Sequence, residues 1–109
     1  PLPLAGYAIW HDRAVFHFLT GPSDRARYVA QVRRAVRPGG HVIMASFAPE
    51  GPSRCSGLEV VRYSPEAMHA EFGSGFRLLE SVREDHHTPG GTTQPFVCCL
   101  FRAEPPAAP

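Results

Sequence analysis

Four consecutive side chains near the start of the chain could do chemistry together: Trp10, His11, Asp12 and Arg13. An imidazole titrates near neutral pH and a carboxylate can orient or deprotonate a nucleophile, so His11 and Asp12 could act as general acid–base groups. They follow a short apolar run, residues 7–10, that is typical of the end of a strand. Open α/β sheets bind ligands at the carboxyl ends of their strands, which makes this turn the best candidate site. The structural alternative is that Asp12 caps a helix and Trp10 packs in the core.

Three further histidines could contact a substrate. His17 lies within the apolar face of a predicted short helix, where the alternative is simple burial in the core. His86 and His87 fall in a polar, turn-rich segment, residues 83–94, and could line an acceptor pocket or lie in a surface turn. We expect no metal site, because the histidine spacings lack the i, i+4 pattern of helical ligands and no Cys-x-x-Cys pair is present.

The elements that must position these residues follow from the hydrophobic pattern. Apolar residues within 14–19 predict a short helix that Asp12 would cap, and Ser23 is a good N-cap for a longer helix. The longer helix carries an apolar stripe at i, i+1, i+4, i+7 and i+8: Tyr28, Val29, Val32, Ala35 and Val36. A Pro-Gly-Gly turn at 38–40 ends it, and the apolar run 42–47 predicts a strand that is covered on both faces.

The second half of the chain predicts one more helix and two strands. Ser64 is followed by a proline and an acid, which is a strong helix start, and Gly73 ends this helix. Residues 76–82 and 95–101 predict strands joined without a helix, which therefore pair in antiparallel fashion. Strands that are connected through helices pair in parallel, so we predict an α/β fold with a mostly parallel sheet and a final antiparallel strand.

The composition indicates a small globular domain. The chain has 109 residues, of which 43% are hydrophobic and 19% charged, enough for one modest core. Its net charge of +1 provides no long-range attraction to nucleic acid or to an anionic membrane, so we expect neither as a partner. Five arginines lie off the apolar stripe of the long helix and predict a solvated surface: Arg25, Arg27, Arg33, Arg34 and Arg37.

The three cysteines do not indicate a disulfide framework, because their number is odd. Cys98 and Cys99 are adjacent in a predicted strand and should point to opposite faces, whereas Cys55 lies in a Gly/Pro/Ser-rich loop. The first four residues, Pro-Leu-Pro-Leu, lack the basic start and the apolar core of a signal peptide. We therefore expect a reducing compartment, the cytoplasm.

The turn at residues 10–13, the Phe-His-Phe-Leu sequence at 16–19 and the Arg-Pro-Gly-Gly sequence at 37–40 together resemble the class I S-adenosylmethionine (SAM)-dependent methyltransferases. The resemblance covers residues 7–102 and implies the C-terminal half of that family's Rossmann-like fold. It also implies SAM as the cofactor, and methyl transfer to an oxygen, nitrogen or sulfur atom of a small-molecule or protein acceptor.

The resemblance also implies roles for individual residues. The turn would lie beside the methionine end of SAM and the acceptor, with Trp10, His11 and Arg13 contacting the cofactor. His11 and Asp12 would be the catalytic pair. The acceptor would contact three histidines: His17, His86 and His87. On either side of this partial domain we expect an irregular lead-in, residues 1–6, and a Pro/Ala-rich tail, residues 103–109.

The sequence lacks the glycine-rich loop after a strand through which that family mainly holds SAM. Ala8 also stands where the family often has an aspartate. Two hypotheses follow: the chain is part of a methyltransferase whose cofactor half lies elsewhere, or it is a non-catalytic remnant that associates through the open edge of its first strand.

Overall fold

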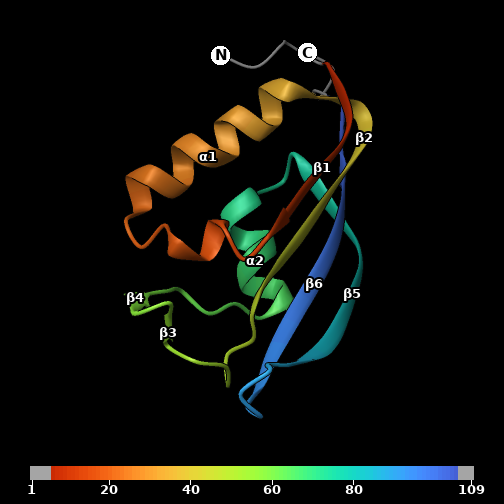
Figure 1. Ribbon diagram of the computed structural model, residues 1–109. Coiled ribbons are helices and arrows are strands. Elements are labelled where there is room, and N and C mark those ends of the chain that lie inside the picture. Colours follow the sequence, from red (N-terminus) through yellow and green to blue (C-terminus); the bar gives the residue numbers. More distant parts are fainter. Residues whose placement is uncertain (1–5, 106–109) are drawn as a thin grey trace.

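The structure, a computed structural model, describes residues 6–105 and consists of one four-stranded sheet with two helices against it (Figure 1). The strands of this sheet are β1 (Tyr7–Arg13), β2 (Val36–Phe47), β5 (Phe76–His87) and β6 (Thr93–Ala103). The helices are η1 (Phe16–Phe18, a 3-10 turn), α1 (Pro22–Ala35) and α2 (Pro65–Phe72). Two short strands, β3 (Arg54–Cys55) and β4 (Leu58–Glu59), pair separately. Most of the predicted lead-in and tail lies outside the described residues.

The strand order is β1-β2-β6-β5, so β6 lies between β2 and β5. β1 pairs with β2 in parallel, whereas β6 runs antiparallel to both of its neighbours. Three strands therefore run in one direction and the last strand runs against them. This confirms the predicted α/β class and the antiparallel last strand. The order of elements along the chain did not predict that this last strand would lie inside the sheet, between β2 and β5.

The connection between α1 and β2 differs from the prediction. α1 begins at Pro22 after Gly21, not after Ser23, and it ends at Ala35, before the Pro-Gly-Gly turn. Residues 37–40 belong to β2, where Gly39 has a φ of +83°. A Cβ atom at Gly40 would lie 2.8 Å from the carbonyl oxygen of Ala8. Gly40 is therefore needed for the close approach of β1 and β2, and Gly39 for the left-handed backbone at the start of β2.

The final hairpin is longer than predicted. β5 continues to His87 and β6 starts at Thr93, so the polar segment 83–94 is mostly strand rather than turn. From Glu80 to His87 the side chains of β5 are exposed, yet the ladder with β6 continues to the pair of His87 with Thr93. Backbone hydrogen bonds extend the strands beyond the covered part of the sheet, where no hydrophobic alternation marks them.

Both helices pack on the same face of the sheet. Val29 and Val32 of α1 and Met68 and Phe72 of α2 join one buried cluster with residues of β2 and β6 that point to that face: Val42, Met44, Val97, Cys99 and Phe101. A smaller cluster on the other face contains Ala45, Phe47 and Phe96, with Val60 from the loop. The predicted double coverage of β2 is therefore confirmed near its end, where Met44 to Ala48 are all buried.

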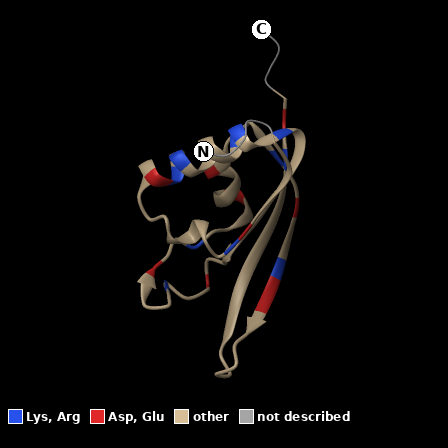
Figure 2. Cartoon of the chain, turned by 45° about the horizontal axis from the view of Figure 1, so that its top comes forward, with Lys and Arg blue, Asp and Glu red and all other residues tan. Residues whose placement is uncertain are grey.

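Charges of both signs are interspersed over the chain (Figure 2). Arg33 donates a hydrogen bond to the carbonyl oxygen of Phe72 and lies over the ring of Phe76, 5.6 Å from its centroid. Arg25 is also bound within the chain, so two of the arginines predicted to be solvated hold α1 to other elements. Neither helix in the described part has the length and hydropathy needed to cross a membrane.

Replacing Phe72 by alanine tests the helix-covered core. Its ring stacks on Phe101 at a centroid distance of 5.2 Å and is 1% exposed. Removing a fully buried ring costs about 3–5 kcal/mol, a large part of the roughly 5–15 kcal/mol that stabilises a small domain. We expect Phe72→Ala to lower the urea midpoint strongly or to unfold the chain. Leu79→Ala, at a side chain that is 44% exposed, should change stability by less than about 1 kcal/mol, and equal losses would contradict this packing.

Candidate functional site

The carboxylate of Asp12 organises the turn that follows β1. Asp12 is 5% exposed, and its Oδ1 accepts a hydrogen bond of 2.9 Å from the backbone N–H of Val15. Its Oδ2 accepts one of 3.1 Å from the N–H of Phe16 and another from the hydroxyl of Tyr28. Three donors therefore surround a buried charge, as the capping alternative requires, although the element that follows is the 3-10 turn η1 instead of an α-helix.

Trp10 lies on the same face as Asp12 and joins the same network. Its indole Nε1 donates a hydrogen bond of 3.0 Å to the hydroxyl oxygen of Tyr28, and the two rings meet edge to face with centroids 5.9 Å apart. Burial, followed by the hydrogen bond to Asp12, raises the pKa of Tyr28. Tyr28 therefore stays protonated and links β1 to α1.

His11 and Arg13 point to the opposite face of the sheet. In the register of β1 with β2, Trp10 and Asp12 face Val42 and Met44 of the helix-covered face, whereas His11 and Arg13 face Ile43 and Ala45. Successive side chains of a strand alternate between faces, and residues 10–13 lie in or at the end of β1. The four candidate residues therefore do not converge on one ligand, since the strand continues where the sequence predicted a turn.

Arg13 is held across the sheet by the final hairpin. Its guanidinium carbon lies 4.8 Å from the centroid of the Phe96 ring, and its Nη2 lies 3.8 Å from Oε1 of Glu84. The ring of His86 meets the same Phe96 ring at 6.1 Å. The structure thus brings His86 and Arg13 to one aromatic side chain, while His87 is exposed and contacts Thr93 within the hairpin.

His17 is buried completely, as the core alternative described. It is 0% exposed and packs against Phe18 and Phe47, with ring centroids 4.7 and 4.8 Å away. Neither ring nitrogen of His17 has a hydrogen-bond partner among the described residues, and the same is true of the buried hydroxyls of Ser46 and Tyr63. Burial lowers the pKa of His17, and the negative charge of Asp12 opposes that effect. The neutral imidazole is therefore the favoured form in the folded chain.

Backbone contacts hold this buried histidine between two segments. The N–H of Val61 donates a hydrogen bond of 2.8 Å to the carbonyl oxygen of His17, and the N–H of Tyr63 donates one of 2.9 Å to that of Phe47. Burial raises the pKa of Tyr63 to about 12, Glu71 adds to this effect and Arg25 opposes it. The segment before α2 thus closes over the ends of β1 and β2 and keeps His17 from solvent.

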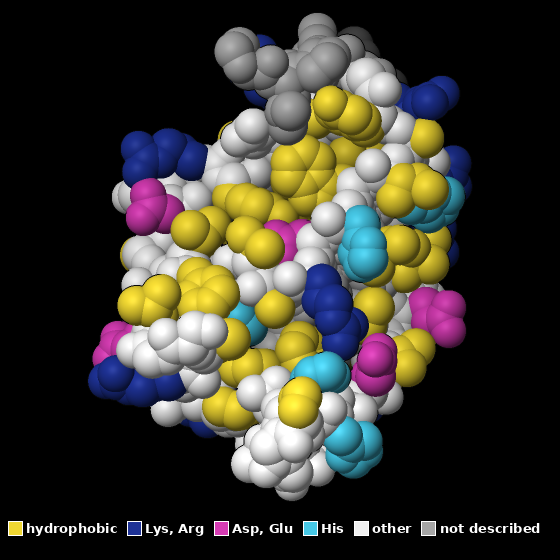
Figure 3. Space-filling model, viewed as in Figure 1, with side chains coloured by type: hydrophobic (Ala, Val, Ile, Leu, Met, Phe, Trp, Pro, Cys, Tyr) yellow, Lys and Arg dark blue, Asp and Glu magenta, His cyan; other side chains and the backbone are white. Residues whose placement is uncertain are grey.

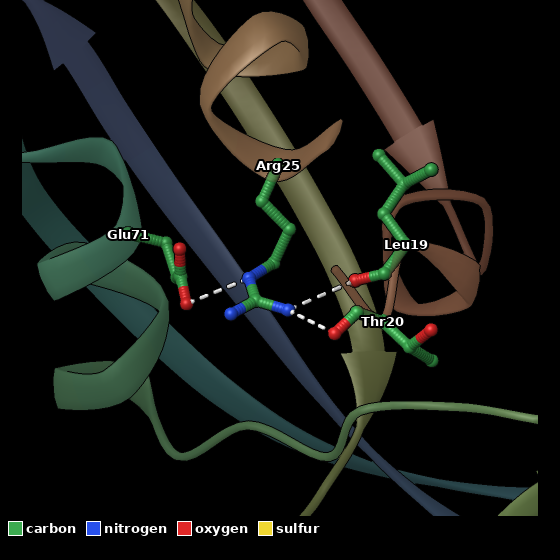
Figure 4. Close-up of polar contacts among 4 residues, drawn as sticks. All are labelled: Leu19, Thr20, Arg25 and Glu71. Atoms are coloured by element: carbon green, nitrogen blue, oxygen red, sulfur yellow. Dashed lines mark hydrogen bonds and ion pairs between the residues drawn. The ribbon is translucent and has the colours of Figure 1, made fainter. Parts of the chain in front are cut away.

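Arg25 ties this end of α1 to the neighbouring elements (Figure 4). Its Nη1 donates hydrogen bonds of 3.2 and 2.8 Å to the carbonyl oxygens of Leu19 and Thr20, and its Nε lies 3.0 Å from Oε1 of Glu71. These contacts join the loop before α1 to α2. Arg25 is therefore a fixed part of the site's framework and is not available to a ligand in this arrangement.

Among the residues that the structure describes, the cysteines and acidic groups form no second catalytic or metal centre. Burial raises the pKa of Cys99 to about 12 and also raises that of Cys98, which makes both thiols poor nucleophiles. Cys99 is buried in the helix-covered cluster and Cys98 lies against the other cluster, which confirms their opposite faces. Within residues 6–105, no three His, Cys, Asp or Glu side chains come together as metal ligands.

Sequence reasoning missed three residues that shape this region: Tyr28, Glu84 and Phe96. Tyr28 stood on the predicted apolar stripe, where a phenol needs a polar partner, so its link to a nearby buried acid could have been suspected. Glu84 carried no such signal, because its contact with Arg13 depends on the strand order and on the register of a hairpin that the sequence did not delimit.

Comparison with known proteins identifies the fold. No protein-family profile matches the sequence, and no curated protein matches it. Among solved structures, a SAM-dependent methyltransferase from Methanosarcina mazei superposes with a TM-score of 0.75 at 10% identity, over 94% of this chain and 62% of that one. The N-methyltransferase NodS from Bradyrhizobium japonicum gives 0.70 at 14% identity, over 96% and 54% of the two chains.

A third solved structure was determined with ligands. The 1,6-didemethyltoxoflavin-N1-methyltransferase from Burkholderia thailandensis, with its substrate and S-adenosylhomocysteine bound, gives a TM-score of 0.68 at 18% identity, over 94% of this chain and 46% of that one. The fold of this chain therefore matches the C-terminal part of the class I SAM-dependent methyltransferase fold. It spans between 46% and 62% of the length of these three proteins.

His17 should make stability depend on pH in a defined direction. Because its pKa is lowered in the folded chain, the unfolded chain takes up a proton near pH 6.5 that the folded chain resists. Stability that is present above pH 6.5 should therefore be lost as the pH falls below that value, by up to about 1.4 kcal/mol per pH unit. We expect the free energy of unfolding to fall more steeply from pH 7 to pH 5 in the wild type than in His17→Leu. Parallel curves would contradict the burial of an unpartnered imidazole.

Proposed function

We propose that this chain is the C-terminal part of a SAM-dependent methyltransferase. The observation that carries the proposal is the superposition on a methyltransferase with a TM-score of 0.75 over 94% of the chain. A second support is the position of the candidate residues at the carboxyl ends of parallel strands β1 and β2, where open α/β sheets bind their ligands.

In the proposed enzyme, the residues of this chain would form part of the pocket around the reacting groups. They would not form a complete SAM site. Trp10 and Asp12 face the helices, His11 and Arg13 face away from them, and no glycine-rich loop follows a strand. This arrangement does not by itself fit a whole SAM molecule. In the proposed enzyme the cofactor would bind mainly to residues beyond this chain, with Trp10, His11 and Arg13 at most at its margin.

The proposed acceptor is a small molecule or a protein side chain that offers an oxygen, nitrogen or sulfur atom. Two of the similar structures are N-methyltransferases, and one was determined with a small heterocyclic substrate, which supports the small-molecule choice.

Asp12, bound by three donors, would position the turn, while the exposed His11 is the side chain free to exchange a proton. His86, beside Arg13, is the proposed acceptor-side residue, with the exposed His87 next to it in the hairpin. His17 is fully buried and does not reach an acceptor in this arrangement. We place the protein in the cytoplasm, which agrees with its three free cysteines.

The proposal predicts that the 109-residue chain binds SAM weakly or not at all. Isothermal titration calorimetry with SAM and with S-adenosylhomocysteine should show no binding in the micromolar range, because the described residues do not enclose the cofactor. Micromolar binding to this chain alone would contradict the division of the site.

The complementary experiment extends the chain. The coding sequence immediately upstream should encode, in frame, a strand followed by a Gly-x-Gly loop, and the longer protein should bind SAM and methylate an acceptor in a radiolabelled-SAM assay. An upstream sequence without such a segment, or an extended protein that still fails to bind SAM, would overturn the proposed function.

A further inference from the structure

The 3-10 turn η1 presents two hydrophobic side chains on its outer side. Phe18 donates its backbone N–H to the carbonyl oxygen of Val15 over 3.1 Å, and side chains three residues apart in a 3-10 turn lie on the same side. Val15 is 59% exposed and Phe18 is half-buried, whereas Phe16 and His17 are buried in the core. The turn after β1 therefore has one exposed apolar side, and Asp12 fixes its backbone.

The short hairpin of β3 and β4 also has one hydrophobic face. Cys55 and Leu58 are directly opposed in its register, so their side chains share a face, and the next pair, Arg54 with Glu59, lies on the other face. Leu58 is 61% exposed and Cys55 is half-buried. Residues 56 and 57 join the two strands with φ values of 52° and 80°, the geometry of a tight two-residue hairpin turn. This turn fixes which side chains share the hydrophobic face.

The apolar side of the turn and the apolar face of the hairpin border one buried cluster. Phe18 and Cys55 both pack against the smaller cluster, which contains Phe47 at the end of β2 and Phe96 of β6. Phe96 also contacts His86, the residue proposed above to lie beside the acceptor, at a centroid distance of 6.1 Å. Both apolar surfaces therefore lie at the carboxyl ends of the parallel strands β1 and β2, where open α/β sheets bind their ligands.

Three charged side chains of this region are already bound within the chain. The carboxylate of Asp12 accepts hydrogen bonds from the turn itself, and Arg25 pairs with Glu71. Arg54 donates a hydrogen bond to the carbonyl oxygen of Gly57 within its own hairpin. A charged ligand on the apolar surfaces would therefore lose its hydration without gaining an opposite charge, whereas a neutral aromatic ring can pack on apolar side chains without that cost.

We propose that Val15, Phe18, Cys55 and Leu58 form the apolar wall of the acceptor site and that the acceptor is a neutral aromatic molecule. This inference rests on the proposed function, because it names the substrate class of the same site. An apolar wall with a polar side chain beside it, here His86, is the usual composition of a small-molecule site. The four residues follow β1 and β2 along the chain. The wall therefore stays part of the site in a longer protein, whose additional residues would close the pocket from other sides.

A nuclear magnetic resonance titration of the 109-residue chain with indole, a neutral aromatic probe, tests the wall. The amide signals of residues 15–18 and 55–58 should shift. Leu58→Asp adds an unpaired charge to the wall and should raise the dissociation constant of indole about tenfold or more. Val82→Asp is the matched control, because Val82 is 51% exposed but lies on β5, away from both surfaces. This control should change the dissociation constant by less than about twofold.

A second ligand tests the substrate class. Indole acetate carries the same ring and a carboxylate, and it should bind about tenfold more weakly or worse, so equal affinity for the two ligands overturns the neutral class. No saturable binding of indole, shifts confined to the neighbourhood of Val82, or equal losses in the two variants overturn the wall itself. Far-ultraviolet circular dichroism checks that both variants fold.

The indole titration and the test of the proposed function fail independently. SAM takes no part in the titration, so its failure leaves methyl transfer to be judged on the longer protein. A longer protein that fails to bind SAM overturns methyl transfer, and the indole titration still decides whether Val15 and Leu58 belong to a site for a neutral aromatic ligand.

Discussion

The buried carboxylate of Asp12 is the interaction on which the site end of the molecule depends. A buried charge is costly unless hydrogen bonds surround it, and this one receives the N–H groups of Val15 and Phe16 and the hydroxyl of Tyr28. Those donors come from the turn after β1 and from α1, so one side chain fixes the direction in which the chain leaves the sheet. Phe16 and His17 then enter the core, and Trp10 joins the network through Tyr28.

The alternation of side chains along β1 limits what the candidate residues can do together. Trp10 and Asp12 belong to the helix-covered face, and His11 and Arg13 to the other face, where Arg13 lies over Phe96. In the view of Figure 3, hydrophobic side chains gather in the upper middle of the molecule, and histidine, basic and acidic side chains lie beside and below them. A ligand on either side of the sheet therefore meets only two of the four residues 10–13.

Sequence patterns predicted most of the fold where hydrophobic periodicity was strong. The apolar stripe of α1, the start of α2 at Pro65 and the buried end of β2 follow directly from periodicity and capping residues. The extent of the hairpin was not predictable, because exposed residues such as Glu84 and His86 are held in strands by the backbone ladder alone. The sequence predicted the candidate residues but not how they are arranged. The sheet face on which each of residues 10–13 lies depends on how far β1 continues, and the contact of Arg13 with Phe96 depends on the strand order.

The most direct test of the central claim is the hydrogen exchange of the Val15 and Phe16 amides, measured by nuclear magnetic resonance. Both N–H groups donate to the buried carboxylate of Asp12, so in the wild type they should exchange more slowly than unprotected amides, and Asp12→Ala should remove that protection. Amides at these positions that exchange at the unprotected rate in the wild type, or that stay protected in Asp12→Ala, would contradict the account in which this carboxylate holds the turn.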